Sequence, residues 1–80
     1  MITTHKYPLM MLRRELHLTQ RKLAEETGLS KTTISAAELC AITGKSIHRA
    51  TAQVILNTIN KYRIRRGYAQ LALEDIDWNL

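Results

Sequence analysis

Apolar residues recur every three or four positions in two separate parts of the chain, which is the period of an α-helix. In the first part, the repeat of Leu9, Leu12 and Leu16 predicts a helix over residues 8–17. Pro8 suits the first helical position, where its missing N–H leaves no helical bond unmade. The second part predicts the longest helix, 48–66, which Gly67 ends. The apolar face of that helix consists of Ala52, Ile55, Ile59 and Tyr62.

The segment between these two helices predicts two shorter helices joined by a tight turn. Thr19 and Ser30 are hydroxyl residues that can cap a first helical turn, which places the helices at residues 20–27 and 31–40. Gly28 lies where the first of them must end in a residue that tolerates positive φ. Ala24 is small enough to let the two helices approach closely. Residues 20–39 therefore read as a helix-turn-helix, followed by a loop at 41–47.

Both ends of the chain are expected to differ from this helical body. Residues 1–7 are predicted to form a flexible arm, and residues 71–80 an acidic tail with one helical turn at 74–77. Three apolar tail residues, Ile76, Trp78 and Leu80, need cover, because an exposed tryptophan is unfavourable. They form either an association surface or a segment folded back onto the core. No strand pattern occurs, so we expect one all-α, compact domain of four or five helices over residues 1–80.

Charge is divided unevenly along the chain, whose net charge is +5. All twelve Lys and Arg residues lie in residues 1–70 against four acids, a local charge of +8, whereas the last ten residues hold three acids and no base. A body this basic favours a polyanion as partner, and a merely solvated basic surface is the alternative.

Several classes of chemistry find no support in the residue pattern. Cys40 is the only cysteine, which excludes an internal disulfide, and no metal-ligand spacing surrounds it. We expect no metal and no cofactor. No catalytic set or phosphate-binding glycine loop is present, so an enzyme is not expected. No membrane-length apolar run and no signal-peptide pattern occur, which predicts a soluble, cytoplasmic protein without membrane association.

Particular residues within this pattern resemble a known family. Arg13 is followed by L-T-Q-x-x-L-A-x-x-x-G-L-S-x-x-x-I-S from Leu18 to Ser35, and then by Glu38. Over residues 9–39 this resembles the lambda-repressor-like helix-turn-helix family, also called the XRE or Cro/repressor type. The resemblance implies that family's fold and binding to double-stranded DNA. Members commonly have glycine directly after the glutamate, whereas Leu39 stands here, which leaves the helix free to run past residue 40.

The resemblance also implies roles for individual residues. Lys31, Thr32 and Ala36 take positions that reach base edges in the major groove, and Ser35 shares their outward face. Arg13 and Glu38 are expected to form a structural ion pair between two helices. Phosphate contacts are expected from Gln20, Arg21, Lys22, Thr33, Lys45 and Arg49. For each basic residue, a solvated surface role is the alternative.

Three functions of different classes fit these observations. The first is a sequence-specific transcriptional regulator, a small repressor that binds DNA as a homodimer. The second is the antitoxin of a toxin–antitoxin pair, which would bind its promoter with this fold and a toxin with another surface, such as the tail around Trp78. The third is a protein-interaction module without DNA binding, against which the basic body and the intact Gln20 and Lys31 argue.

Overall fold

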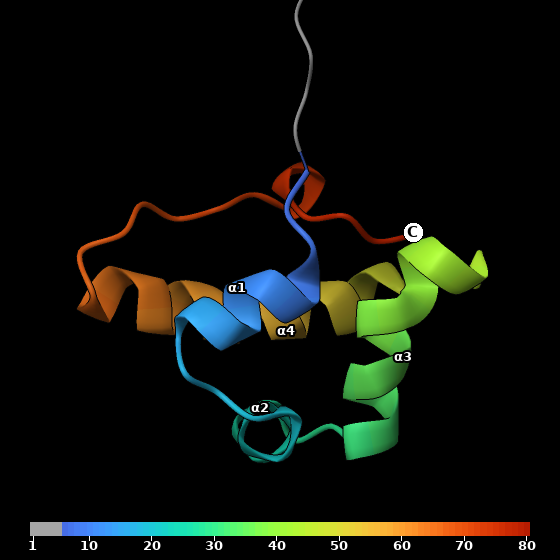
Figure 1. The fold of residues 1–80 in the computed structure, drawn as a ribbon, viewed down its shortest axis with the longest axis horizontal. Coiled ribbons are helices and arrows are strands. Elements are labelled where there is room, and N and C mark those ends of the chain that lie inside the picture. Colours follow the sequence, from blue (N-terminus) through green and yellow to red (C-terminus); the bar gives the residue numbers. More distant parts are fainter. Residues whose placement is uncertain (1–5) are drawn as a thin grey trace, which may run out of the picture.

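The expected helices form around one apolar core in the computed structural model, which describes residues 6–80. The chain order is α1 (Leu9–Glu15), α2 (Gln20–Thr27), α3 (Lys31–Thr43), α4 (Arg49–Arg65) and a short 3₁₀ turn, η1 (Leu73–Asp75). In Figure 1, α1 lies in front of α4, α2 is seen nearly end-on, and α3 stands upright beside them. The predicted all-α fold of four or five helices is confirmed over the described residues.

The turn between α2 and α3 has the local structure that the sequence predicts. The Thr19 hydroxyl accepts from the backbone N–H of Lys22 at 3.0 Å, and the Ser30 hydroxyl accepts from that of Thr33 at 3.0 Å. Each hydroxyl thereby satisfies an N–H group that has no partner within its helix. Gly28 ends α2 with φ of 75°. The predicted bounds of α2 are therefore confirmed.

The bounds of the other helices differ from the prediction. Pro8 precedes α1 with an extended ψ of 135°, and α1 ends at Glu15 rather than at residue 17. His17 adopts a positive φ of 56°, while the N–H groups of His17 and Leu18 donate to the carbonyls of Arg14 and Arg13. This is the bond pattern of a helix C-terminus that is usually closed by glycine.

A longer α3 is the largest change among the helices. It continues to Thr43, where the prediction ended it at residue 40, because the buried face continues through Cys40 and the first glycine is Gly44, with φ of 76°. The loop that was predicted at 41–47 therefore begins only at Gly44. The last of the four helices, α4, is one residue shorter at each end than predicted.

The core is built from one stripe of each helix. Among the described residues, α2 packs against α3 and α4, and α1 packs against α3. Leu23, Ile34, Ile55 and Ile59 are completely buried, and Ala52 is also buried, as the apolar spacing of α4 predicted. The surrounding buried side chains are Leu9, Leu12, Leu16, Leu18, Ala24, Ala37, Cys40 and Leu56.

The C-terminal segment belongs to this core, which corrects the prediction of an association surface at Ile76 and Trp78. Ile76 is 0% exposed and Trp78 is 7% exposed, while the Trp78 indole N–H donates to the carbonyl of Leu73 at 3.0 Å. The segment therefore folds back onto the core, which was the alternative expectation, and runs along the upper side of α1 and α4 in Figure 1. Its short helix is η1 rather than a turn at 74–77. Leu80 alone of the three is exposed, at 47%.

The predicted N-terminal arm lies largely outside the described residues. Tyr7, its last residue, pairs with the C-terminal segment in a single parallel bridge to Ile76. The Tyr7 N–H donates to the carbonyl of Asp75 at 2.8 Å, and its carbonyl accepts from the N–H of Asp77 at 2.9 Å. These bonds attach the chain that enters α1 to the segment covering the core.

Candidate nucleic-acid interface

A buried ion pair joins α1 to α3. Arg13 Nε donates to Glu38 Oε2 at 2.5 Å and Arg13 Nη2 donates to Oε1 at 3.3 Å. The Arg13 side chain is 11% exposed and the Glu38 side chain only 2%. The two residues expected to pair thus lie in contact and almost out of water. Each charge then depends on the other, because an unpaired charge in this position would lose its hydration without replacement.

Two further hydrogen bonds connect this pair to the start of α2. Arg13 Nη1 donates to the carbonyl of Leu18 at 2.8 Å, and Gln20 Nε2 donates to Glu38 Oε1 at 3.0 Å. One network therefore holds α1, the first residue of α2 and the third turn of α3 in fixed relation. Since the Gln20 amide nitrogen has two hydrogens, one remains for an acceptor outside the protein.

The four residues expected to read bases share one surface of α3. Lys31, Thr32 and Ala36 are exposed, and Ser35 is half-buried. All four line a shallow depression, together with Gln20 and Leu39. We call it the α3 depression. Leu39 was not expected there, because the family pattern offers no apolar side chain at that position.

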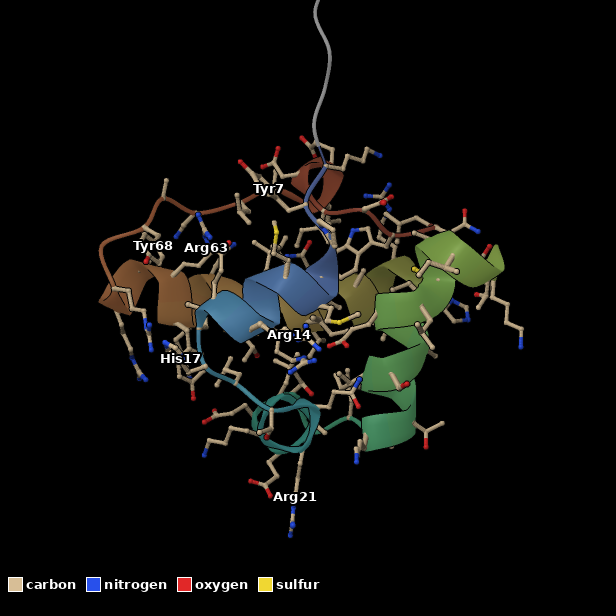
Figure 2. The ribbon with its side chains drawn as sticks, viewed as in Figure 1. Tyr7, Arg14, His17, Arg21, Arg63 and Tyr68 are labelled. Atoms are coloured by element: carbon tan, nitrogen blue, oxygen red, sulfur yellow. The ribbon has the colours of Figure 1, made fainter. Side chains whose placement is uncertain are left out.

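A second, larger concave surface lies between α1, the start of α2 and α3. Arg13, Arg14, His17, Arg21 and Lys31 line it. We call it the basic groove. Figure 2 shows Arg14 between α1 and α2, His17 at the end of α1, and Arg21 pointing away from the body of the protein. Lys31 lines both surfaces, so the groove and the α3 depression are continuous.

Sequence reasoning missed Arg14 and His17 as members of this groove. The helical period of α1 does not indicate whether the exposed Arg14 faces α2 or open solvent. The positive φ of His17 turns the chain toward α2, and no glycine marks that turn.

The residues expected to contact phosphate do not form one surface. Gln20 and Arg21 line the basic groove, whereas Lys22 does not. Lys22 Nζ instead lies 3.6 Å from a carboxylate oxygen of Glu26, one turn along α2. Thr33 is half-buried, and its hydroxyl shares a hydrogen bond with that of Ser30 at 2.9 Å. Lys45 lies in the loop between α3 and α4, Arg49 is the first residue of α4, and both are exposed.

Comparison with protein families identifies the type of this domain. A helix-turn-helix family model matches residues 9–51, which is more than half of the chain. The protein belongs to the lambda-repressor-like helix-turn-helix family. This is a family of DNA-binding regulators. No curated protein and no solved structure matches the chain. The matched range contains α1, α2, α3, both members of the ion pair and all four residues expected to read bases.

On the side of α2 that faces α4, this helix-turn-helix protein has a second polar cluster. The Tyr62 hydroxyl donates to Glu26 Oε1 at 2.7 Å, and Lys61 Nζ donates to Oε2 at 3.3 Å. These two bonds, that of Tyr62 first, lower the pKa of Glu26 below its ordinary value. The bond to Glu26 raises the pKa of Tyr62. The cluster connects α2 to α4 and thereby holds the helix-turn-helix motif against α4.

The described part of this helix-turn-helix protein contains neither a cluster of metal-ligating side chains nor a membrane-spanning helix. Between residues 6 and 80, no three His, Cys, Asp or Glu side chains come together as a metal site would require. None of the helices in that range is long and apolar enough to cross a bilayer.

Proposed function

We propose that this protein is a sequence-specific transcriptional regulator, a small repressor that binds a two-fold symmetric DNA site as a homodimer, with α3 in the major groove. The observation that carries the proposal is the α3 depression, where Lys31, Thr32, Ser35 and Ala36 lie on one accessible helix face. Lys31 can donate to guanine O6 or N7, and Thr32 can bond a base or contact a thymine methyl.

The basic groove supports the same orientation. Arg14, Arg21 and Lys31 are exposed there, next to the N-terminus of α2. Positive side chains and unpaired helix N–H groups both attract phosphate. A DNA backbone lying in this groove would place α3 beside the bases, since the two surfaces share Lys31. Lys45 and Arg49 would reach phosphates at the other end of α3.

A dimer agrees with the size of the protein. Its principal extents are 40 × 32 × 20 Å. Half-sites one helical turn apart on the same face of DNA are separated by about 34 Å. Two copies with these dimensions would therefore meet side by side. Repression requires only that the bound dimer occupy a promoter.

The tail gives the antitoxin alternative little support. Ile76 and Trp78 are core residues, and Leu80 is the one large apolar side chain of the tail that is exposed. We therefore propose regulation of transcription without a toxin as partner.

The test is selection of bound fragments from a genomic DNA library, followed by footprinting of the enriched sequence. The expected result is one enriched motif with two-fold symmetry and two protected half-sites separated by about one helical turn. A single protected half-site would refute the dimer. Equal recovery of all sequences would refute sequence-specific recognition.

A further inference from the structure

Leu39 is a large apolar side chain on the surface of α3. It is 41% exposed and stands outside the buried core. It lines the α3 depression and also the basic groove. A large apolar side chain that is 41% exposed and lies outside the core, on a surface otherwise suited to DNA, can serve contact with DNA as well as packing.

The α3 depression as a whole is better equipped for apolar contact than for hydrogen bonding. Lys31 is its only charged side chain, and the Gln20 amide already donates to Glu38. None of its lining residues is an asparagine or arginine, which could bond a base through two parallel hydrogen bonds. Beside Lys31 and the hydroxyl groups of Thr32 and Ser35, the depression presents the methyl groups of Thr32 and Ala36 and the side chain of Leu39.

These three apolar groups lie on one line of the helix. Thr32, Ala36 and Leu39 follow the spacing i, i+4 and i+7, which brings side chains to the same face of an α-helix. Seven residues of helix rise by about 10 Å. Stacked base pairs are about 3.4 Å apart, so this length corresponds to about three base-pair steps. The strip is thus long enough to contact methyl groups of successive bases.

We propose that Leu39 is a specificity-determining residue that, with Thr32 and Ala36, contacts C5-methyl groups of pyrimidines in the major groove. This inference rests on the proposed function. In unmodified DNA the C5-methyl group marks thymine. The same group at the same ring position occurs in 5-methylcytosine, so either base fits the apolar strip. Cytosine and uracil lack the methyl group and leave the strip without a partner.

The test uses the full chain and the DNA sequence that it selects. Each thymidine of one half-site is replaced in turn by deoxyuridine, which removes only the methyl group, and Kd is measured by fluorescence anisotropy at one salt concentration. At the thymidine that faces Leu39, wild type is expected to lose about fourfold in affinity, the effect of one buried methyl group. Leu39→Ala is expected to bind the thymidine site about fourfold more weakly and to be insensitive to the replacement there.

Two arms separate the methyl group from other features of the base. Deoxycytidine at the sensitive position should bind more weakly than 5-methyldeoxycytidine with wild type, and equally with Leu39→Ala. Ile42→Ala is the matched control, because Ile42 is an apolar residue of the same helix, 80% exposed, that does not line the α3 depression. It is expected to keep the sensitivity of wild type to deoxyuridine.

The outcomes are distinguishable. If wild type selects a defined sequence but tolerates deoxyuridine at every position, this inference is wrong and the proposed function stands. If Leu39→Ala retains the full wild-type sensitivity, Leu39 is not the residue that reads the methyl group. If wild type selects no sequence, both proposals fail together. The wild-type measurement needs no variant, so a folding defect in Leu39→Ala, visible by circular dichroism, would not prevent a decision.

Discussion

Removing one partner of the Arg13–Glu38 pair should destabilise the protein far more than removing both. In Arg13→Met, the Glu38 carboxylate, which is 2% exposed in the native protein, keeps a single donor, Gln20 Nε2. Breaking a buried ion pair in this way is expected to lower the free energy of unfolding by about 3–5 kcal/mol. The whole stability of a domain of 80 residues is about 4–12 kcal/mol. One substitution would thus remove a large part of it.

Glu38→Leu should have a similar effect, because it leaves the Arg13 guanidinium without its carboxylate. The double variant, Arg13→Met with Glu38→Leu, removes both charges. It should lose less than either single variant, because neither charge is left unpaired, so the coupling energy should be at least as large as one single loss, about 3–5 kcal/mol. The coupling measures how far each charge depends on the other in the absence of water.

The assay is urea unfolding followed by circular dichroism. With a slope of about 1 kcal/mol per molar urea, each single variant should shift the midpoint down by about 3–5 M. Arg21→Met is the control, because the Arg21–Glu25 pair of α2 is 84% and 60% exposed, and its loss should change stability by less than about 0.5 kcal/mol. Single losses below about 1 kcal/mol, or strict additivity, would refute the view that this pair is a buried structural element.

Four further predictions follow from particular residues. His17→Gly should raise the free energy of unfolding by about 0.5–1 kcal/mol, because it relieves the positive φ of 56°, and a loss of stability in urea would contradict this. Gly28→Ala should lower it by about 1 kcal/mol through its φ of 75° alone, since the added Cβ meets nothing within 4 Å, and an unchanged midpoint would count against that reasoning. Tyr62→Phe should raise the pKa of Glu26 toward its ordinary value, as measured by an NMR titration. A lowered carboxyl pKa stabilises the fold at pH values above the ordinary pKa, and this stabilisation is lost as the pH falls through the lowered pKa. The stability of the variant should therefore depend less on pH in acid than that of wild type. Arg14→Ala should reduce the slope of log K against log salt for DNA binding by about one, and an unchanged slope would remove Arg14 from the phosphate contacts.

The local parts of the fold were predictable from the sequence, and the reason is visible in α2. Its start depends on the Thr19 hydroxyl and its end on Gly28, so neighbouring residues settle both bounds. The same holds for the start of α3 at Ser30. The end of α1 was predicted less well, because His17 takes a conformation that usually requires glycine.

Features that depend on contacts between distant segments were not predictable. Whether Trp78 covers the core or faces a partner depends on where the C-terminal segment runs along α1 and α4, and local periodicity contains no such information. The same applies to Lys22, because whether it lines the basic groove beside Arg21 depends on how α2 is set against α1 and α3. The position of Arg14 in the basic groove depends in the same way on how α1 lies against the start of α2.

The claim that α3 reads DNA sequence is tested most directly by one ratio of affinities. Kd would be measured for the selected DNA sequence and for a scrambled sequence at one salt concentration. The proteins compared are wild type, the double variant Lys31→Ala/Thr32→Ala and the control Lys61→Ala. Lys61 lies on α4 and lines neither the basic groove nor the α3 depression. We predict a preference of at least about 10³ for wild type and for Lys61→Ala, and its collapse in the double variant. Equal preferences in all three proteins would contradict the account, because sequence would then be read somewhere other than α3.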